Sequence, residues 1–317
     1  MLHLFMPNVL FIGSFPEEKL KNLPFTILQA SIPESVEFGA SFIKKLEKAE
    51  VLISRSGCKF TVSLLEKAPK LKLIIKAGAG VDMIDREYCI SRKIKIQNVP
   101  GGNKEAVAEI AIGFALSLAR NITKANSDTR SSNWNKDSFV GEELYGAFVS
   151  VIGFGNIGKR TAELLRVFGC QITVYDPTMT AEEKDHALRS GYHVEDCLNC
   201  VVKKARFIFL HPSLSITSKG MLNEDIFKKM QKMPYIVNLS RASVVDEKAL
   251  LDAFKNKQIS GAAIDVWWEE PIKNNLFLDY NVIMTPHIGG STKESLNKIT
   301  DGVISQVINF FNLNEEK

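Results

Sequence analysis

Gly153-Phe154-Gly155-Asn156-Ile157-Gly158 is the stretch that decides how this chain folds. It follows an apolar run, Phe148–Ile152, and precedes a helical pattern that starts near Lys159. In that strand–turn–helix setting, Gly-x-Gly-x-x-Gly indicates a dinucleotide site. The first glycine makes the tight turn, the second lets the backbone approach a pyrophosphate, and the third lets the helix pack on the strand. The first N–H groups of the helix then bind the phosphates.

The place of this fingerprint in the chain is as informative as its residues. Roughly half of the 317 residues precede it, so a second folded unit has to be built there. A chain of this length favours two domains over one. Its 45% hydrophobic and 24% charged residues are ordinary for a soluble globular enzyme, which is the class that we expect.

Charge and hydropathy argue against several classes of partner. The net charge of +4 is too small to indicate a nucleic-acid-binding protein, and no aromatic residues are interleaved with basic ones. The first ten residues lack the basic start and apolar core of a signal peptide. The longest apolar stretch, residues 106–119, is interrupted by Glu109 and is too short to cross a bilayer. We therefore expect a cytoplasmic protein that binds neither nucleic acid nor a membrane.

The five cysteines fit a reducing cytoplasm, since an odd number cannot all form pairs. Cys197 and Cys200 form a lone Cys-x-x-Cys. A zinc or redox role would need a second pair or a thioredoxin-like context, and the sequence shows neither. We therefore interpret these two residues as incidental reduced thiols and expect no metal site.

Both halves of the chain alternate short apolar runs with helical patterns, which predicts an α/β fold with parallel sheets covered by helices on both faces. The expected strands are residues 8–13, 25–30, 50–55, 71–77 and 94–99, then 148–154, 171–176, 207–211, 235–239, 261–266 and 282–285. The expected helices are residues 35–48, 61–67, 84–91, 104–125, 156–167, 181–190, 223–229, 246–254 and 292–311. We expect helix 104–125 to be buried all round, Asp246 to be an N-cap and residues 126–146 to form a loop.

A carboxylate follows the fingerprint at the distance that selects the cofactor. Asp176 ends the next predicted strand, 18 residues beyond Gly158. There it would accept hydrogen bonds from the adenosine ribose and repel a 2′-phosphate, and residues 177–180 contain no arginine or lysine. The sequence therefore predicts NAD rather than NADP. The alternative is a chance motif in which Asp176 merely caps a loop; the strand, helix and acid in register favour the NAD site.

Three residues with chemically useful side chains lie farther along the chain, each just past a predicted strand. They are Arg241, Glu270 and His287. Open α/β sheets bind ligands outside the carboxyl ends of their strands, so the three are candidates for one site. Each also has an ordinary alternative, namely a surface cation, a solvated acid beside Glu269 and a buried structural histidine.

Several motifs in one order give the chain a resemblance to a known family. Residues 76–82 (Lys-Ala-Gly-Ala-Gly-Val-Asp), residues 98–100 (Asn-Val-Pro), the fingerprint and residues 285–287 (Thr-Pro-His) match the D-isomer-specific 2-hydroxyacid dehydrogenases. The resemblance covers nearly the whole chain. It implies a Rossmann NAD-binding domain, residues 102–289, inserted into a flavodoxin-like substrate domain made of residues 1–101 and 290–317. It also implies a homodimer joined through the cofactor domains and the region 106–146.

The resemblance implies a role for each of the three candidates in interconverting a small anionic 2-hydroxy acid and its 2-oxo acid. His287 would exchange a proton with the substrate oxygen near neutral pH. Glu270 would orient the imidazole and stabilise its charged form. Arg241 would hold the substrate carboxylate with its planar fork and polarise the carbonyl group.

The resemblance also implies contacts with cofactor and substrate. The backbone amides of Ala79 and Gly80 would bind the second oxygen of the substrate carboxylate, and Asp265 would meet the nicotinamide carboxamide. The full set of expected cofactor contacts is Gly153, Gly155, Asn156, Ile157, Gly158, Asp176, His211, Leu239, Ser240, Asp265, Gly289 and Gly290. The chain departs from the family pattern at residues 241–243 (Arg-Ala-Ser for Arg-Gly-Gly), 82–85 (Asp-Met-Ile-Asp for Asp-Asn-Ile-Asp) and Ser213 (for proline), and none of these removes a catalytic group.

One arginine bears on the substrate. Arg55, after the third predicted strand, and Trp134 with residues 139–144 resemble the branch of the family that acts on D-3-phosphoglycerate. An arginine at the Arg55 position faces the substrate phosphate in that branch, and a guanidinium suits a phosphate dianion; the alternative is a surface arginine. A glyoxylate or hydroxypyruvate reductase is the alternative within the family, and an NAD-sensing scaffold protein is the alternative outside enzymes. Because the chain ends soon after its last predicted helix, we expect a short form without a regulatory domain.

Overall fold

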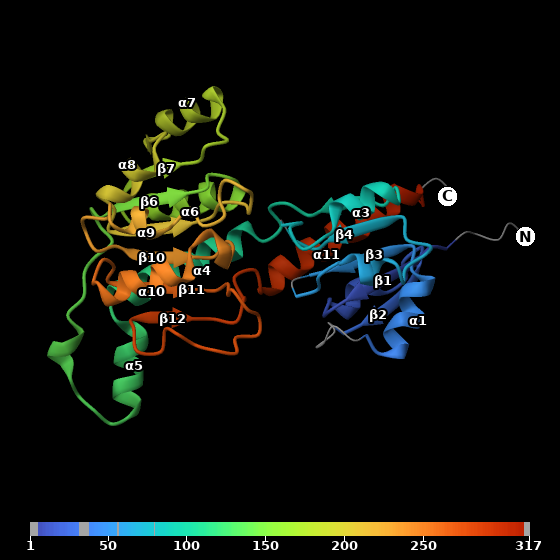
Figure 1. The fold of residues 1–317 in the computed structure, drawn as a ribbon, viewed down its shortest axis with the longest axis horizontal. Helices are drawn as coiled ribbons and strands as arrows, with labels where there is room; N and C mark the ends of the chain where they lie inside the picture. Colours follow the sequence, from blue (N-terminus) through green and yellow to red (C-terminus); the bar gives the residue numbers. More distant parts are fainter. Residues whose placement is uncertain (1–5, 32–37, 56, 79, 314–317) are drawn as a thin grey trace, which may run out of the picture. The chain divides into compact units, whose positions relative to one another are not determined.

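The computed structural model describes residues 6–31, 38–55, 57–78 and 80–313, and its two sheets are shown in Figure 1. The chain divides into two compact units, Met1–Asn103 with Ser291–Lys317, and Lys104–Gly290. Each unit is built around one sheet in which every pair of neighbouring strands is parallel. This confirms the predicted α/β class. The assignment of the first unit to the substrate and of the second to the cofactor remains a prediction at this point.

The sheet of the first unit has the order β2-β1-β3-β4-β5, which is the flavodoxin-like order. Its central strands are apolar and buried on both faces, as parallel strands between two helical layers are. The strands are β1 (Asn8–Ile12), β2 (Thr26–Ala30), β3 (Val51–Ser54), β4 (Leu73–Lys76) and β5 (Lys95–Asn98). The helices are η1 (Glu17–Leu20), α1 (Ala40–Lys48), α2 (Val62–Leu65), α3 (Arg86–Ser91) and α11 (Lys293–Phe311).

Helix α11 completes this first unit although it lies at the far end of the sequence. Its buried side chains Ile299, Val303 and Val307 share a core cluster with Val9 and Phe11 of β1. Each such buried aliphatic or aromatic side chain stabilises the fold by about 1.5–3 kcal/mol relative to exposure. The helix therefore covers one face of the sheet, and the helices α1 to α3 contribute to the cluster on the other face.

The sheet of the second unit has the order β12-β11-β10-β9-β6-β7-β8. This is the Rossmann order 3-2-1-4-5-6 with a seventh strand added, so the crevice for a ligand opens between β6 and β9. The strands are β6 (Phe148–Ile152), β7 (Gln171–Tyr175), β8 (His193–Val194), β9 (Phe207–Leu210), β10 (Tyr235–Asn238), β11 (Gly261–Ile264) and β12 (Val282–Met284). The helices are α4 (Lys104–Ala119), α5 (Ile122–Arg130), η2 (Lys136–Phe139), α6 (Asn156–Val167), α7 (Ala181–Arg189), α8 (Leu198–Lys203), α9 (Glu224–Phe227), η3 (Ala242–Val244) and α10 (Glu247–Lys255).

Helix boundaries follow local chemistry where it is strong. Helix α6 spans the predicted residues 156–167, and Asp246 caps α10 as predicted, since its Oδ1 accepts a hydrogen bond of 2.8 Å from the Ala249 N–H. The predicted helix 35–48 begins at Ala40 in the structure, and residues 35–37 of that prediction lie outside the described residues.

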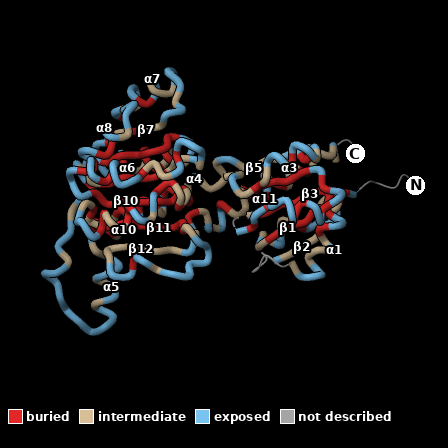
Figure 2. The backbone as a smooth tube through the Cα atoms, in the orientation of Figure 1, coloured by how far each residue is buried: buried red, intermediate tan, exposed pale blue. Residues whose placement is uncertain are grey.

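The predicted single helix 104–125 was wrong. Helix α4 ends at Ala119, and Asn121 adopts a left-handed conformation with φ 52° before α5 begins. Asparagine tolerates that conformation better than most residues, so the chain turns there. Helix α5 then extends into residues 126–146, which we predicted to be a loop, and η2 follows within the same segment. Figure 2 shows the contrast between the buried α4 and the exposed α5.

Among the residues that the structure describes, no single helix has the length and apolar character needed to cross a membrane. Helices α4 and α5 meet those criteria only when taken as a pair, which is bent by 64°.

Candidate active site

The glycine turn between β6 and α6 has the geometry that a dinucleotide site requires. Gly153 has φ +89°, and a side chain there would collide with the backbone of Pro212. A side chain at Gly158 would collide with the carbonyl oxygen of Gly153, so its absence brings helix and strand together. At Gly155 an added Cβ would meet none of the described atoms within 4 Å. The second glycine therefore leaves open space at the start of α6, where no side chain of the described residues caps the helix.

Asp176 fixes the end of β7 against this turn. Its Oδ2 accepts a hydrogen bond of 2.9 Å from the Phe154 N–H. Its Oδ1 accepts from the N–H and the hydroxyl of Thr178, at 2.9 and 2.7 Å. The carboxylate thus caps its own loop and also reaches back to the glycine turn. Since a carboxylate has about four acceptor positions, it retains capacity for a ribose hydroxyl.

His211 follows β9, on the other side of the crevice from the glycine turn. Its Nε2 lies 3.0 Å from the hydroxyl of Thr161 on α6, while its Nδ1 is buried and has no hydrogen-bond partner among the described residues. Burial lowers the pKa of His211 to about 3, so the imidazole is neutral at physiological pH. An orphaned polar atom beside the fingerprint fits a site that a dinucleotide completes.

Arg241 is presented by a turn that the sequence did not reveal. Asn238, at the end of β10, is buried and donates from Nδ2 to the Arg241 carbonyl oxygen at 3.1 Å. Its Oδ1 accepts from the Ser240 N–H and hydroxyl at 3.1 and 3.0 Å. Arg241 Nη1 donates to the Ser240 carbonyl oxygen at 2.8 Å. A polar residue closing an apolar strand was the only signal of this turn in the sequence.

Glu270 and His287 form a pair, as predicted from their order. The Nδ1 of His287 lies 3.0 and 2.9 Å from the two carboxylate oxygens of Glu270, and the Trp267 N–H donates to the same carboxylate at 3.1 Å. Because Nδ1 faces the carboxylate, Nε2 is the ring nitrogen that remains for a substrate. About a third of each side chain is exposed to solvent, so a small molecule has access.

The charges around Glu270 keep it ionised. Burial would raise its pKa, but the hydrogen bond and charge of His287, the Trp267 N–H and the charge of Arg241 together lower the pKa below its usual value. The effect of Arg241 on this pKa means that its guanidinium lies near the pair. The structure therefore brings all three predicted catalytic residues together within the second unit.

The loop that carries His287 is held by Asp265. His287 has φ +54°, a left-handed conformation that costs about 1–3 kcal/mol for a residue with a side chain. Asp265 is buried and accepts hydrogen bonds from the Thr285 hydroxyl at 2.6 Å, the Ile288 N–H at 2.8 Å and the Gly289 N–H at 2.7 Å. These bonds fix the backbone that follows His287 and the side chain of Thr285 that precedes it. The contact of Asp265 with a nicotinamide carboxamide remains a prediction.

The predicted substrate contacts lie in the first unit, at the carboxyl ends of β3 and β4. The Arg55 side chain donates from Nη1 to the Ser14 carbonyl oxygen at 3.5 Å, and its own carbonyl oxygen accepts from the Lys76 ammonium. Burial lowers the pKa of the Arg55 guanidinium, which remains charged because its usual pKa is so high. Gly80 belongs to the same unit, and Ala79 lies outside the described residues. Within the described part of the chain, no group of three or more His, Cys, Asp or Glu side chains is placed to hold a metal ion.

Comparison with known proteins gives one family. The model of the D-isomer specific 2-hydroxyacid dehydrogenase NAD-binding domain matches residues 112–289. D-3-phosphoglycerate dehydrogenase from Methanocaldococcus jannaschii is 38% identical over 289 residues, which cover 87% of this chain and 54% of that protein. The Bacillus subtilis enzyme of the same name is 35% identical over 267 residues, which cover 84% of this chain and 50% of that protein. This chain thus spans about half the length of the curated relatives that it matches.

A solved structure extends the likeness to both units. The crystal structure of D-lactate dehydrogenase from Aquifex aeolicus, complexed with NAD and lactic acid, matches with a TM-score of 0.82 and 28% identity. The match covers 96% of each chain. The fold that the sequence predicted is therefore that of this solved relative.

Proposed function

Since the chain belongs to the D-isomer specific 2-hydroxyacid dehydrogenase family, whose NAD-binding domain it contains, we propose that it interconverts D-3-phosphoglycerate and 3-phosphohydroxypyruvate. The observation that supports the reaction type is the Glu270–His287 pair beside Arg241, in the unit that carries the glycine fingerprint. The observations that support the substrate are Arg55 and the two relatives that bear this name.

Bound at the fingerprint, NADH would supply the hydride that reduces the 2-oxo group. The Nε2 of His287 donates a proton to the carbonyl oxygen of the substrate in that direction, and accepts it back in the other. Glu270 stabilises the imidazolium form through Nδ1 and keeps the ring in place, as an orienting carboxylate does elsewhere. The depressed pKa of Glu270 ensures that this carboxylate is charged at neutral pH.

Arg241 binds the carboxylate of the substrate and polarises its carbonyl group. A guanidinium matches a carboxylate with two parallel hydrogen bonds, which fixes the plane of the substrate as well as its position. The hydrogen bonds of Asn238 fix the position of the Arg241 backbone, from which the guanidinium extends. In this proposal the N–H groups of Ala79 and Gly80 would bind the other carboxylate oxygen, as the family resemblance implies.

Arg55 binds the phosphate of the substrate in this proposal. Its guanidinium is partly buried, which strengthens its attraction for a dianion because less water screens the charge. The Lys76 ammonium, which donates to the Arg55 carbonyl oxygen, adds a second positive charge at the ends of β3 and β4. A small unphosphorylated 2-oxo acid is the second candidate substrate, because the structural relative named above was crystallised with lactic acid.

A substrate panel with NADH tests the assignment. We expect the purified protein to oxidise NADH with 3-phosphohydroxypyruvate far faster than with pyruvate or glyoxylate. Arg55→Ala removes one charged hydrogen-bonding group and should weaken the phosphorylated substrate by about 10- to 150-fold in kcat/KM, the value of about 1.5–3 kcal/mol for such a bond. It should change the rate with glyoxylate little. Turnover of glyoxylate without turnover of the phosphorylated substrate would contradict the assignment.

His287→Ala tests the reaction type independently of the substrate. We expect kcat to fall by about 10²–10⁴-fold, which is the usual contribution of a positioned general acid. His193→Ala, at an exposed position of β8, is the matched control and should keep the wild-type rate. Stopped-flow measurement of NADH absorbance gives both values, and a near-normal rate in His287→Ala would refute the role of this residue.

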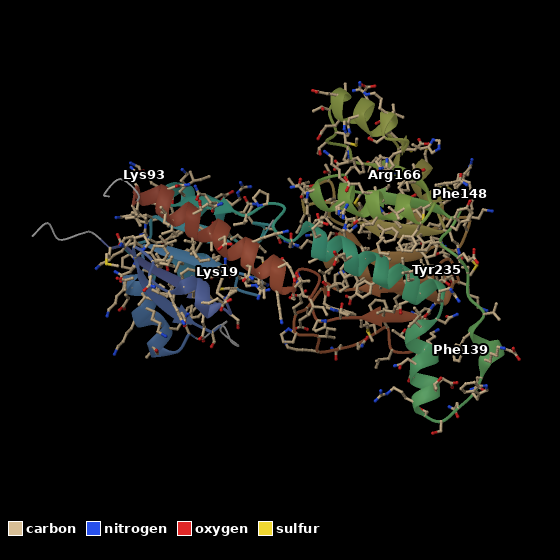
Figure 3. The ribbon with its side chains drawn as sticks, turned by 180° about the vertical axis from the view of Figure 1, so that it is seen from behind. Lys19, Lys93, Phe139, Phe148, Arg166 and Tyr235 are labelled. Atoms are coloured by element: carbon tan, nitrogen blue, oxygen red, sulfur yellow. The ribbon has the colours of Figure 1, made fainter. Side chains whose placement is uncertain are left out.

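The same proposal includes a cytoplasmic homodimer that serves serine biosynthesis. The segment around η2 carries several exposed apolar side chains. They are Trp134 (84% exposed), Val140 (82%) and Tyr145 (79%), and Phe148 at the start of β6 is nearly half exposed. Figure 3 labels Phe139 and Phe148, which lie well apart along this segment of the second unit. Exposed apolar side chains concentrated on one segment are typical of an interface. Sedimentation equilibrium tests the assembly, and a monomer at micromolar concentration would contradict it.

A further inference from the structure

The turn from β8 into α8 brings two cysteines together on the surface of the second unit. Cys197 precedes the helix and Cys200 lies in its first turn, and both are exposed. The Cys200 N–H donates to the Cys197 carbonyl oxygen at 3.0 Å, and the Val201 N–H donates to the same oxygen at 3.1 Å. A turn of this kind holds the two Cα atoms within about 7 Å of each other. A disulfide needs Cα atoms about 4.4–6.8 Å apart, so the backbone can accommodate one with little movement.

The two exposed thiols have unequal surroundings. Hydrogen bonding from Cys200 and from the Asn199 N–H acts on the Cys197 thiol. These bonds favour the thiolate and lower the pKa of Cys197, whereas the bond to Cys197 raises the pKa of Cys200. Cys197 is therefore the thiol that is more readily deprotonated, and Cys200 is the thiol that keeps its proton.

The charged groups nearby do not cancel this asymmetry. Glu195 raises the pKa of both thiols, and Lys203 lowers that of Cys200, but each acts less strongly than the hydrogen bonds between the cysteines. The carboxylate of Asp196 is paired with Lys184 at 2.5 Å. The charge of Cys197 raises the pKa of Tyr175, after burial as the largest cause, so the pair lies close to the end of β7.

The other three cysteines have the opposite character. Cys58 and Cys89 are buried, and burial raises the pKa of each. Burial also raises the pKa of Cys170 to about 11. Thiols of this kind are inert at neutral pH, because the thiolate is the reactive form. The described residues offer no third ligand that would turn the exposed pair into a metal site.

We propose that Cys197 and Cys200 form a thiol–disulfide exchange site whose substrate is a small-molecule disulfide such as oxidised glutathione. The Cys197 thiolate attacks one sulfur of the disulfide, the S–S bond breaks, and the first thiolate leaves and takes up a proton. Cys200 then loses its proton and attacks the Cys197 sulfur of the mixed disulfide, which releases the second thiol and closes the Cys197–Cys200 disulfide. Two electrons pass from the protein to the small disulfide, and an excess of the thiol reverses both steps.

Mass spectrometry of the intact, folded protein tests this proposal. With excess oxidised glutathione at neutral pH, the wild type should lose two hydrogen atoms without gaining glutathione, and peptide mapping should find the Cys197–Cys200 disulfide. Reduced glutathione in excess should restore the two thiols. Cys200→Ser removes the resolving thiol and should trap one glutathione on Cys197. Cys197→Ser removes the attacking thiol and should form no internal disulfide.

Cys170→Ser is the matched control and should behave as the wild type does, because it leaves both exposed thiols in place. Circular dichroism of every variant checks that the fold is retained. The proposal is overturned if Cys200→Ser traps no glutathione on Cys197. It is equally overturned if the wild type accumulates separate glutathione adducts on the two cysteines instead of the internal disulfide. Neither result depends on the substrate of the dehydrogenase.

Discussion

His287 takes a left-handed backbone conformation that is uncommon for a residue with a side chain. Asp265 supports it by accepting hydrogen bonds from the Ile288 and Gly289 N–H groups that follow it and from the Thr285 hydroxyl that precedes it. The imidazole is therefore directed by the backbone and by Glu270 rather than by free rotation of its own side chain. The sequence predicted His287 and Glu270 because each follows a strand in the order typical of the family. It did not predict the loop-holding role of Asp265 or the turn made by Asn238, because a buried polar residue at a strand end shows its partners only once the backbone is folded.

The buried His211 makes stability depend on pH. Its pKa is about 3 in the folded protein and about 6.5 in an unfolded chain, so the unfolded state binds an extra proton between these values. The stabilisation is complete above pH 6.5 and is lost as the pH falls towards 3. At pH 5 this linkage costs about 2 kcal/mol, since each pH unit below 6.5 contributes about 1.4 kcal/mol.

We therefore expect the free energy of unfolding to fall between pH 7.5 and pH 5 by about 2 kcal/mol more in the wild type than in His211→Asn. Urea unfolding at the two pH values measures the difference. His186→Asn, on the exposed side of α7, is the control and should follow the wild type. If His211→Asn has the same pH dependence as the wild type, the buried imidazole is not the cause.

At the scale of the elements, two glycines of the turn between β6 and α6 have different roles: Gly153 is needed for the fold, and Gly155 leaves space for a cofactor. Gly153→Ala and Gly155→Ala add the same methyl group two residues apart, but only the first collides with the backbone of Pro212 and only the first has a positive φ. We expect Gly153→Ala to lower the stability by more than 1 kcal/mol, as a side chain at a strained position does. Gly155→Ala should keep the melting temperature and weaken NADH binding instead.

Differential scanning fluorimetry and NADH fluorescence titration give the two readouts for this pair of variants. Equal loss of stability in both variants would mean that Gly155 serves the fold rather than the cofactor. Unchanged NADH affinity in Gly155→Ala would mean that the pyrophosphate does not lie at this turn.

Long, apolar elements were predictable, and short or interrupted ones were not. Strands β3, β4 and β6 occur where runs of aliphatic residues predicted them, because burial on both faces leaves a continuous apolar signal. Strand β8 has two residues and α8 has six, so neither shows a period that a sequence pattern can reveal. The break at Asn121 was missed because the chain is helical on both sides of it and a single left-handed residue separates the two helices.

At the scale of the whole molecule, the two units differ in how they are encoded. The second unit is one continuous segment, Lys104–Gly290, with its own core clusters. The first unit needs α11 from the end of the chain to cover one face of its sheet.

We expect a fragment of residues 104–290 to unfold cooperatively and to bind NADH, and a fragment of residues 1–103 to fail to fold alone. Thermal circular dichroism of both fragments checks this, with 1–103 mixed with a peptide of residues 291–317 as the control that should regain structure. A cooperative transition in 1–103 alone would contradict the role assigned to α11.

Because the first unit is encoded in two separate segments, its sheet and the helix that covers it are synthesised at different times. The five strands of its sheet are synthesised before residue 103, but the helix that covers them starts at Lys293, about 190 residues later. At about 5–20 residues per second, translation leaves that apolar face waiting for about 10–40 s. During this interval the entire second unit emerges and has time to fold. We therefore expect the apolar face that α11 covers to stay exposed on the nascent chain during this interval, and slower translation to lengthen that exposure.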